Sequence, residues 1–183
     1  MRRTVVLVSL AAVLISCANP TFVTPGAGGP DPDDPHAALA LDAYEAVIRE
    51  LVGLERIEWE TIYVQGVICD NGGTAEEPVG CDERLSDAER SELRDRLADL
   101  EAPVRFVDTY READPDDRIL EGRERSVFVA LGPISRGPEG SLEVPGGMHC
   151  GGLCGRGATW RLVRRDGRWV VNGAVDGSAG WIA

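Results

Sequence analysis

Apolar residues recur every three or four positions over residues 37–51, a spacing that places them on one face of an α-helix. Asp34 is a suitable N-cap, Pro35 suits the first helical position and Gly53 suits a C-terminal stop, so the pattern predicts a helix of about 17 residues. A second helix is predicted from Ser86, which forms a capping-box pattern with Glu89, as far as the helix-breaking Pro103.

Runs of β-branched and aromatic residues predict strands over 59–69, 104–107 and 126–131, the first with a possible bulge at Gly66. The polar segments 70–84 and 110–125 between them are predicted as loops. Helices that precede a set of strands, without regular β-α alternation, predict an α+β fold: two helices packed on a mainly antiparallel sheet.

The clearest local unit is a C-terminal β-hairpin over residues 158–171, where two alternating runs flank Asp166-Gly167, the signature of a type I′ turn. Counting outward from the turn places Arg165 opposite Arg168 and Leu162 opposite Val171. The resulting core face carries four apolar side chains, which are Trp160, Leu162, Trp169 and Val171.

Residues 1–17 have the pattern of an export signal, with Arg2 and Arg3 ahead of an uncharged, mostly apolar run. That run of about 12 residues is too short to cross roughly 30 Å of hydrocarbon. Its end, Leu14-Ile15-Ser16-Cys17, resembles the lipobox of bacterial lipoproteins. The resemblance implies cleavage before Cys17, acylation of its sulfur, and a lipid-anchored protein on the extracytoplasmic side of the cell membrane or the outer membrane. The alternative is an ordinary secretory signal that ends at a structural cysteine.

The segment after Cys17 is rich in proline, glycine and aspartate, a composition typical of an extended tether. The expected organisation is a signal peptide over 1–16, the acylated cysteine and tether over 17–35, and a single α+β domain over 36–183.

The net charge of −12, from 31 acidic and 19 basic residues, argues against a nucleic-acid partner. Removal of Arg2 and Arg3 with the signal gives 17 − 31 = −14 for the mature part. Because an anionic membrane repels such a domain, the membrane is expected to be a partner only through the N-terminal lipid.

Five cysteines are an odd number, and assigning Cys17 to the lipid leaves an even set outside the cytoplasm: Cys69, Cys81, Cys150 and Cys154. Of three possible connectivities, Cys69–Cys81 with Cys150–Cys154 is preferred, since both close loops without crossing the core. Metal binding by His149, Cys150 and Cys154, or thiol redox chemistry, is the alternative, but Cys-x3-Cys is a weak spacing for either. No metal and no cofactor are predicted.

The glycine-rich segment 146–157 carries His149, and its Gly152-Leu153-Cys154-Gly155 is followed by Asp166-Gly167-Arg168-Trp169. This combination resembles uncharacterised secreted or lipid-anchored bacterial proteins, and the resemblance implies no activity. The acidic segment 112–124 does not fit a calcium loop, because Arg118 stands where the third ligand belongs.

A catalytic set is not evident in the sequence. No Gly-x-Ser-x-Gly elbow is present, and because His36 starts a helix, any serine triad depends on His149. We therefore expect a non-catalytic binding or interaction module, and the sequence does not identify its ligand. The alternative is a cell-envelope hydrolase that uses His149, which requires His149 at the base of a cleft beside a carboxylate and a hydroxyl.

Overall fold

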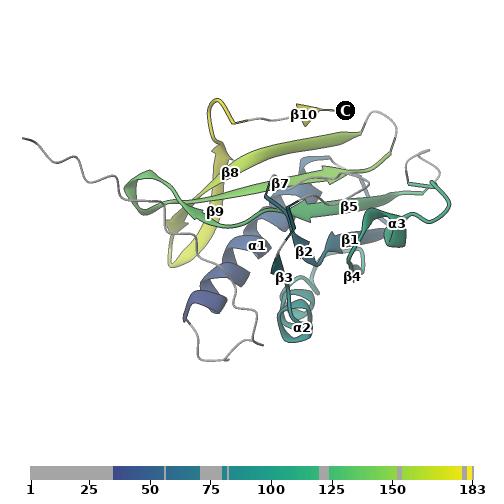
Figure 1. Cartoon of the computed structure of the whole chain (residues 1–183), viewed down its shortest axis with the longest axis horizontal. Helices are drawn as coiled ribbons and strands as arrows, with labels where there is room; N and C mark the ends of the chain where they lie inside the picture. Colours follow the sequence, from purple (N-terminus) through teal and green to yellow (C-terminus); the bar gives the residue numbers. More distant parts are fainter. Residues whose placement is uncertain are drawn as a thin grey trace, which may run out of the picture.

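One mixed β-sheet with helices packed against it forms the core of an α+β fold (Figure 1). The computed structural model describes residues 35–55, 57–70, 80–81, 83–119, 124–151, 154–178 and 181–182. The predicted signal peptide, Cys17 and nearly all of the tether lie outside the described residues. None of the described helices has the length and apolar character needed to span a membrane.

The described elements follow one another along the chain as α1 (Pro35–Leu54), β1 (Thr61–Gln65), β2 (Val67–Ile68), β3 (Glu83–Arg84), α2 (Asp87–Arg96), β4 (Val104–Val107), α3 (Tyr110–Ala113), β5 (Ser126–Leu131), β6 (Ser135–Arg136), a 3-10 turn (Pro138–Gly140), β7 (Leu142–His149), β8 (Gly155–Arg165), β9 (Arg168–Ala174) and β10 (Trp181–Ile182). The main sheet has the order β10-β8-β7-β5-β1-β4, with β6 paired to β7 and β9 paired to β8. Only β1 forms parallel pairs, with β4 and with β5. The described sheet is therefore mainly antiparallel, as predicted.

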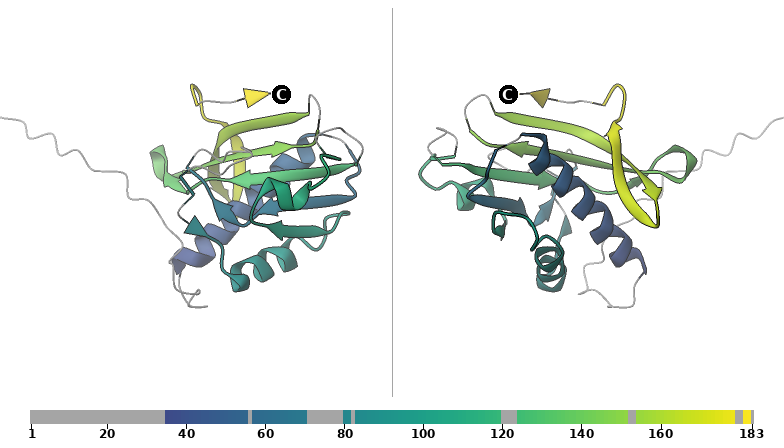
Figure 2. Two further views of the ribbon diagram at one scale, coloured as in Figure 1. Left: turned by 45° about the vertical axis from the view of Figure 1, so that its right-hand side comes forward. Right: turned by 180° about the vertical axis from the view of Figure 1, so that it is seen from behind.

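Helix α1 lies across one face of the sheet, as the two views of Figure 2 show. Its apolar stripe is fully buried at Tyr44, Val47, Ile48 and Leu51, against strand residues that include Val144 and Leu162. Gly146 on β7 permits this close approach, because a Cβ there would lie 3.1 Å from the Val47 side chain. Burial of this stripe against the sheet is what fixes the position of α1.

The second helix begins as the capping box predicts. The Ser86 hydroxyl accepts a hydrogen bond from the Glu89 N–H, and the Glu89 carboxylate accepts one from the Ser86 N–H. Both backbone N–H groups at the start of α2 are therefore hydrogen-bonded. Leu93 and Leu97 are fully buried in the core that α2 shares with α1.

The C-terminal hairpin has the predicted turn and register. Asp166 and Gly167 both have positive φ, at 51° and 80°, as a type I′ turn requires. Arg165 pairs with Arg168, and Leu162 pairs with Val171. The predicted core face is buried at Trp160 and Leu162 but only half-buried at Trp169 and Val171.

The strand predicted over 59–69 is wrong in one respect, because it divides at Gly66 into β1 and a separate β2. The β2 strand leaves the main sheet and pairs with β3, inside the segment 70–84 that was predicted as a loop. The guanidinium of Arg90 occupies the space beside Gly66 at this break: a Cβ there would lie 2.4 Å from its Cζ. A long-range contact with α2 therefore requires a residue without a side chain at the position where the strand divides.

The segment 110–125 is also not simply a polar loop. Thr109 caps the short helix α3, and Tyr110 and Ile119 are buried in a second, smaller apolar cluster on the other face of the sheet.

The glycine-rich segment 146–157 contributes its first residues to β7 and its last to β8, two central strands, so half of it belongs to the sheet and not to a surface loop.

Candidate functional site

His149, the residue on which a hydrolase would depend, is the last residue of β7. Its ring lies on the face of the sheet that α3 covers. Its ring meets the Tyr110 ring edge-on at 5.6 Å between centroids, and Tyr110 meets Phe128 in the same way at 5.1 Å. The Tyr110 hydroxyl donates to the Asp114 carboxylate at 3.1 Å, and the Ile119 N–H donates to the same carboxylate at 3.0 Å. His149 thus lies near a carboxylate and a hydroxyl, although the hydroxyl is a phenol.

The chemistry at His149 is that of a packed, neutral ring. Burial lowers the pKa of His149, and the nearby charge of Asp114 opposes that effect only in part. Its Nε2 atom is buried and has no hydrogen-bond partner among the described residues. Two pockets that are lined by described residues, and that are presented below, do not include His149. Since a general base must reach a nucleophile, these neighbours favour a packing role for His149.

Four cysteines form two disulfides, Cys69–Cys81 and Cys150–Cys154, the same connectivity that the sequence favours. Because each sulfur is bonded to another, none of the four is a thiolate available to a metal. Across the described residues, no group of three or more His, Cys, Asp or Glu side chains has an arrangement suited to a metal ion. Cys17 lies outside the described residues.

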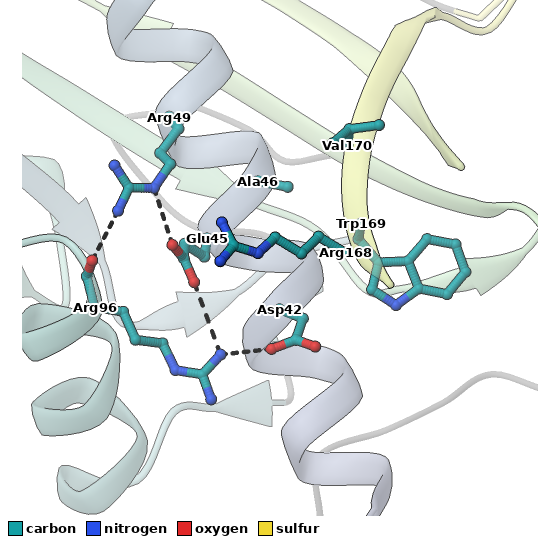
Figure 3. Close-up of a pocket in the computed structure, with 8 residues that line it drawn as sticks. All are labelled: Asp42, Glu45, Ala46, Arg49, Arg96, Arg168, Trp169 and Val170. Atoms are coloured by element: carbon teal, nitrogen blue, oxygen red, sulfur yellow. Dashed lines mark hydrogen bonds and ion pairs between the residues drawn. The ribbon is translucent and has the colours of Figure 1, made fainter. Parts of the chain in front are cut away.

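The larger of the two described pockets is a groove across the exposed side of α1 (Figure 3). Its volume is about 500 Å³. Four residues of α1 at helical spacing form its floor, Arg96 at the end of α2 lines one side, and the start of β9 lines the other. The full lining is Asp42, Glu45, Ala46, Arg49, Arg96, Arg168, Trp169 and Val170. We call this pocket the α1 groove.

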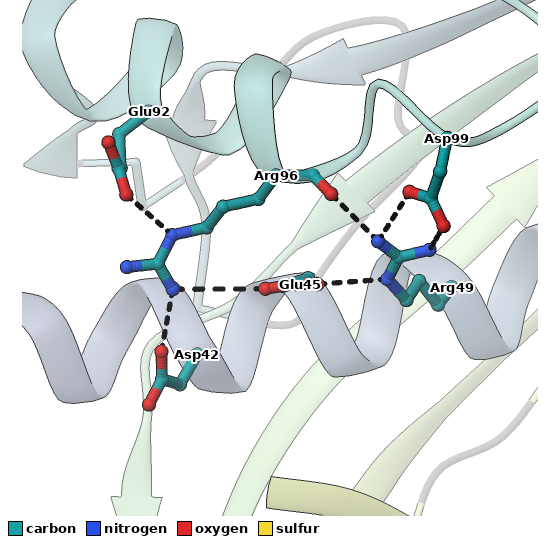
Figure 4. Close-up of polar contacts among 6 residues, drawn as sticks. All are labelled: Asp42, Glu45, Arg49, Glu92, Arg96 and Asp99. Atoms are coloured by element: carbon teal, nitrogen blue, oxygen red, sulfur yellow. Dashed lines mark hydrogen bonds and ion pairs between the residues drawn. The ribbon is translucent and has the colours of Figure 1, made fainter. Parts of the chain in front are cut away.

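Two arginines of the α1 groove are held in an ion-pair network that links α1 to α2 (Figure 4). Arg96 contacts Asp42 at 2.6 Å and Glu92 at 2.8 Å. Arg49 contacts Glu45 at 2.9 Å and Asp99 at 2.7 Å, and it also donates to the Arg96 carbonyl at 2.7 Å. These guanidinium groups are therefore already neutralised by carboxylates, and they shape the groove.

Arg168 differs from both. Its side chain extends from β9 toward α1 (Figure 3), yet no described carboxylate lies within 4.0 Å of it, and no hydrogen bond joins it to a described residue. The neighbouring Trp169 also keeps an unused donor. The indole N–H groups of Trp59 and Trp160 bond to the carbonyls of Val52 and Gly146, whereas that of Trp169 bonds to no described residue. Arg168 and Trp169 both line the groove, and in Figure 3 their side chains extend in opposite directions from β9.

A second, smaller pocket of about 200 Å³ adjoins the α1 groove and shares Arg49 with it. Its walls are mainly apolar and include Val52, Trp59 and Leu100. Ile57, which also lines it, is the exposed large hydrophobic residue of the described chain, with 40% of its surface accessible. The two pockets together form a surface that is charged at one end and apolar at the other.

Sequence reasoning did not find the α1 groove. The one local signal is the polar stripe of Asp42, Glu45 and Arg49, whose spacing of three and four places it opposite the buried face of α1. Arg168 and Trp169 are recognisable as hairpin residues, but their meeting with α1 depends on the twist of the sheet.

In comparisons with known proteins, no family model matches the chain, and no curated protein or solved structure matches it either.

Proposed function

We propose that this protein is a lipid-anchored extracytoplasmic binding protein, held by acylated Cys17, whose α1 groove binds a ligand through an anionic group. The observation that supports binding is Arg168, a groove-lining guanidinium without an ion pair among the described residues; Trp169, which also lines the groove, has an indole N–H that bonds to no described residue. Carboxylates and phosphates accept from both donor types, and a guanidinium binds them in a bidentate geometry.

The anion is expected at Arg168 and not elsewhere in the groove. Arg49 and Arg96 already satisfy two or more carboxylate contacts each, so a ligand would have to break these pairs to use them. Arg168 offers its charge without that loss. It stands out further because the chain as a whole carries a net charge of −12.

The binding test uses the indole N–H signal of Trp169 in a nitrogen-proton NMR spectrum, titrated with N-acetylglutamate and, separately, with inorganic phosphate. We expect a saturable shift of this signal, and a loss of affinity of at least about tenfold in Arg168→Ala. The matched control is Arg105→Ala, since Arg105 is an exposed strand arginine on β4, at the other edge of the sheet. Equal affinity in both variants would contradict the assignment to Arg168.

The anchor has its own test. In cells, Cys17→Ser should release the protein from membranes or leave an unprocessed precursor, because no acyl chain can then be attached. Membrane fractionation identical to that of the unaltered chain would contradict lipid anchoring.

A further inference from the structure

One edge of β9 pairs with no described strand, and residues of β9 line the α1 groove. We propose that an extended acidic peptide segment of a partner protein binds there as an added antiparallel or parallel strand. This inference rests on the proposed function of the groove and names the class of ligand that carries the anionic group.

Within the part of the chain that the structure describes, no strand pairs with the edge of β9 that faces away from β8. Its other side pairs with β8 from Arg165↔Arg168 to Leu162↔Val171 and, beyond an irregularity, at Trp160↔Ala174. Strand β10 pairs with β8 at Gly157 and Arg156, past the end of β9, so it does not cover this edge.

Main-chain groups point outward from this edge at alternate positions. Arg165 and Arg168 flank the two-residue turn and form its hydrogen-bonded pair. Because such pairs alternate with non-hydrogen-bonded ones, the N–H and C=O of Trp169 and of Val171 point away from β8. No described residue hydrogen-bonds to these groups. They are therefore the groups that an added strand would use.

The groove reaches this edge and not merely one face of the strand. Three consecutive residues, Arg168, Trp169 and Val170, line it. Since successive side chains point to opposite faces of a strand, a pocket against a single face would be lined by alternate residues. Contact with all three indicates that the groove runs along the strand edge.

Charge favours an acidic occupant. Residues 155–174 carry five arginines and one acidic residue, Asp166, which gives 5 − 1 = +4 in a chain of net charge −12, although Arg161 is ion-paired with Glu143. Near the turn, Arg164 donates to the Gly167 carbonyl, Arg165 donates to Asn172, and Arg168 has no described partner. None of the three is ion-paired with a described carboxylate, so glutamate or aspartate side chains on an added strand would find arginines at the edge.

An anionic lipid surface would use the arginines but would leave the main-chain groups of β9 without a role. A strand uses both features. The peptide is therefore the occupant that the combination favours.

The experiment uses the purified protein and an acetylated octapeptide of alternating valine and glutamate. We expect binding in isothermal titration and at least about tenfold slower hydrogen exchange at the amides of Trp169 and Val171, because these become hydrogen-bonded. The same peptide N-methylated at alternate residues, and its valine-lysine counterpart, should each bind at least about tenfold more weakly. Binding of the N-methylated peptide with unchanged affinity would overturn strand addition.

A variant pair tests the protein side. Val171→Pro removes the outward N–H and leaves the pairing with β8 intact, since an edge strand tolerates proline where its N–H faces outward. Val171→Ala keeps the N–H and shortens the side chain, so it is the matched control. We expect only the proline variant to lose octapeptide affinity, by at least about tenfold. The methylated peptide is read on unaltered protein, so the proposal stays testable even if the proline variant folds poorly.

The outcomes separate this inference from the proposed function. If the octapeptide does not bind while N-acetylglutamate still shifts the Trp169 signal in a manner that depends on Arg168, strand addition is wrong and the proposed anion binding by the α1 groove is supported. If neither binds, both are wrong. Arg168-dependent binding to phosphatidylglycerol vesicles without octapeptide binding would identify a lipid surface as the occupant and would also overturn the inference.

Discussion

Replacing Gly66 by alanine should destabilise the protein by expelling the Arg90 side chain from its place beside the β1–β2 break. The backbone of Gly66 does not have a positive φ, so alanine itself is not strained there. The obstacle is the side chain of Arg90, whose Cζ and Nη2 would both lie 2.4 Å from the new Cβ. Because real Cβ atoms do not approach other atoms so closely, Arg90 must move.

The size of the expected decrease in the free energy of unfolding follows from the contacts that Arg90 makes. Its side chain is 15% exposed, donates to the Leu85 carbonyl at 3.0 Å and pairs with Asp108 at 2.7 Å. Hydrogen bonds to a charged group contribute about 1.5–3 kcal/mol each. Asp108 keeps its pair with Arg84, and the displaced guanidinium regains water, so the expected net loss is about 2–3 kcal/mol. For a domain of this size that is a decrease in Tm of about 5–10 °C.

A double-mutant cycle isolates this cause. In an Arg90→Ala background the clash is gone, and Gly66→Ala should then be neutral or stabilising by up to about 1 kcal/mol through the unfolded chain. The free energies come from urea unfolding of the four proteins. An equal loss from Gly66→Ala in both backgrounds would refute the steric explanation.

Three further predictions concern other parts of the described structure. Replacing Cys69 and Cys81 together by alanine should cost about 3 kcal/mol in urea unfolding, since the cross-link between them closes a loop with a separation of 12 residues; an unchanged midpoint would contradict this. Burial lowers the folded-state pKa of His149, so the unfolded chain takes up a proton first as the pH falls below about 6.5, and stability decreases there by at most about 1.4 kcal/mol per pH unit. His149→Phe should flatten this part of the stability–pH curve, and a curve of unchanged slope would contradict the assignment of this pH dependence to His149. Arg96→Ala removes ion pairs with Asp42 and Glu92 that are all partly exposed, so it should cost roughly 1 kcal/mol and less in 1 M NaCl; a loss that is independent of salt would point to packing instead.

Local patterns were enough to predict the elements that local interactions determine. The α2 capping box, the strands β4 and β5, and the register of the hairpin all follow from residues within a few positions of one another. Asp166-Gly167 fixes the turn, and the turn fixes every pair outward from it. Such features do not depend on the rest of the chain.

Features that depend on distant residues were missed or only partly predicted. The division of the first predicted strand at Gly66 coincides with a contact to Arg90, 24 positions away. The strand β7 contains Pro145 and two glycines, which lower its β-propensity, and it forms because it pairs with β5 and β8 on both sides. Tertiary pairing there outweighs local preference.

The candidate site was not predictable for the same reason. The groove joins residues of α1, α2 and β9 that are more than 120 positions apart at the extremes, from Asp42 to Val170. His149 attracted attention because histidine is rare in this chain, yet its surroundings are those of a packed ring. Arg168 was recognised only as the hairpin residue opposite Arg165, and its proposed role in binding depends on the absence of a described partner.

The distribution of charge determines over what range the α1 groove would attract the anionic ligand that we propose for it. A chain with net charge −12 repels an anionic ligand at long range, whereas the +4 of residues 155–174 attracts it only close to the hairpin. At physiological ionic strength the Debye length is about 8 Å, so the repulsion from distant carboxylates is screened while an ion pair with Arg168 at contact distance is much less affected. Charge in this protein therefore contributes little to capturing a ligand from a distance. Under the proposed function, charge would instead select among ligands that already lie in the groove, because Arg168, which has no ion pair with a described residue, favours an acidic group over a basic one.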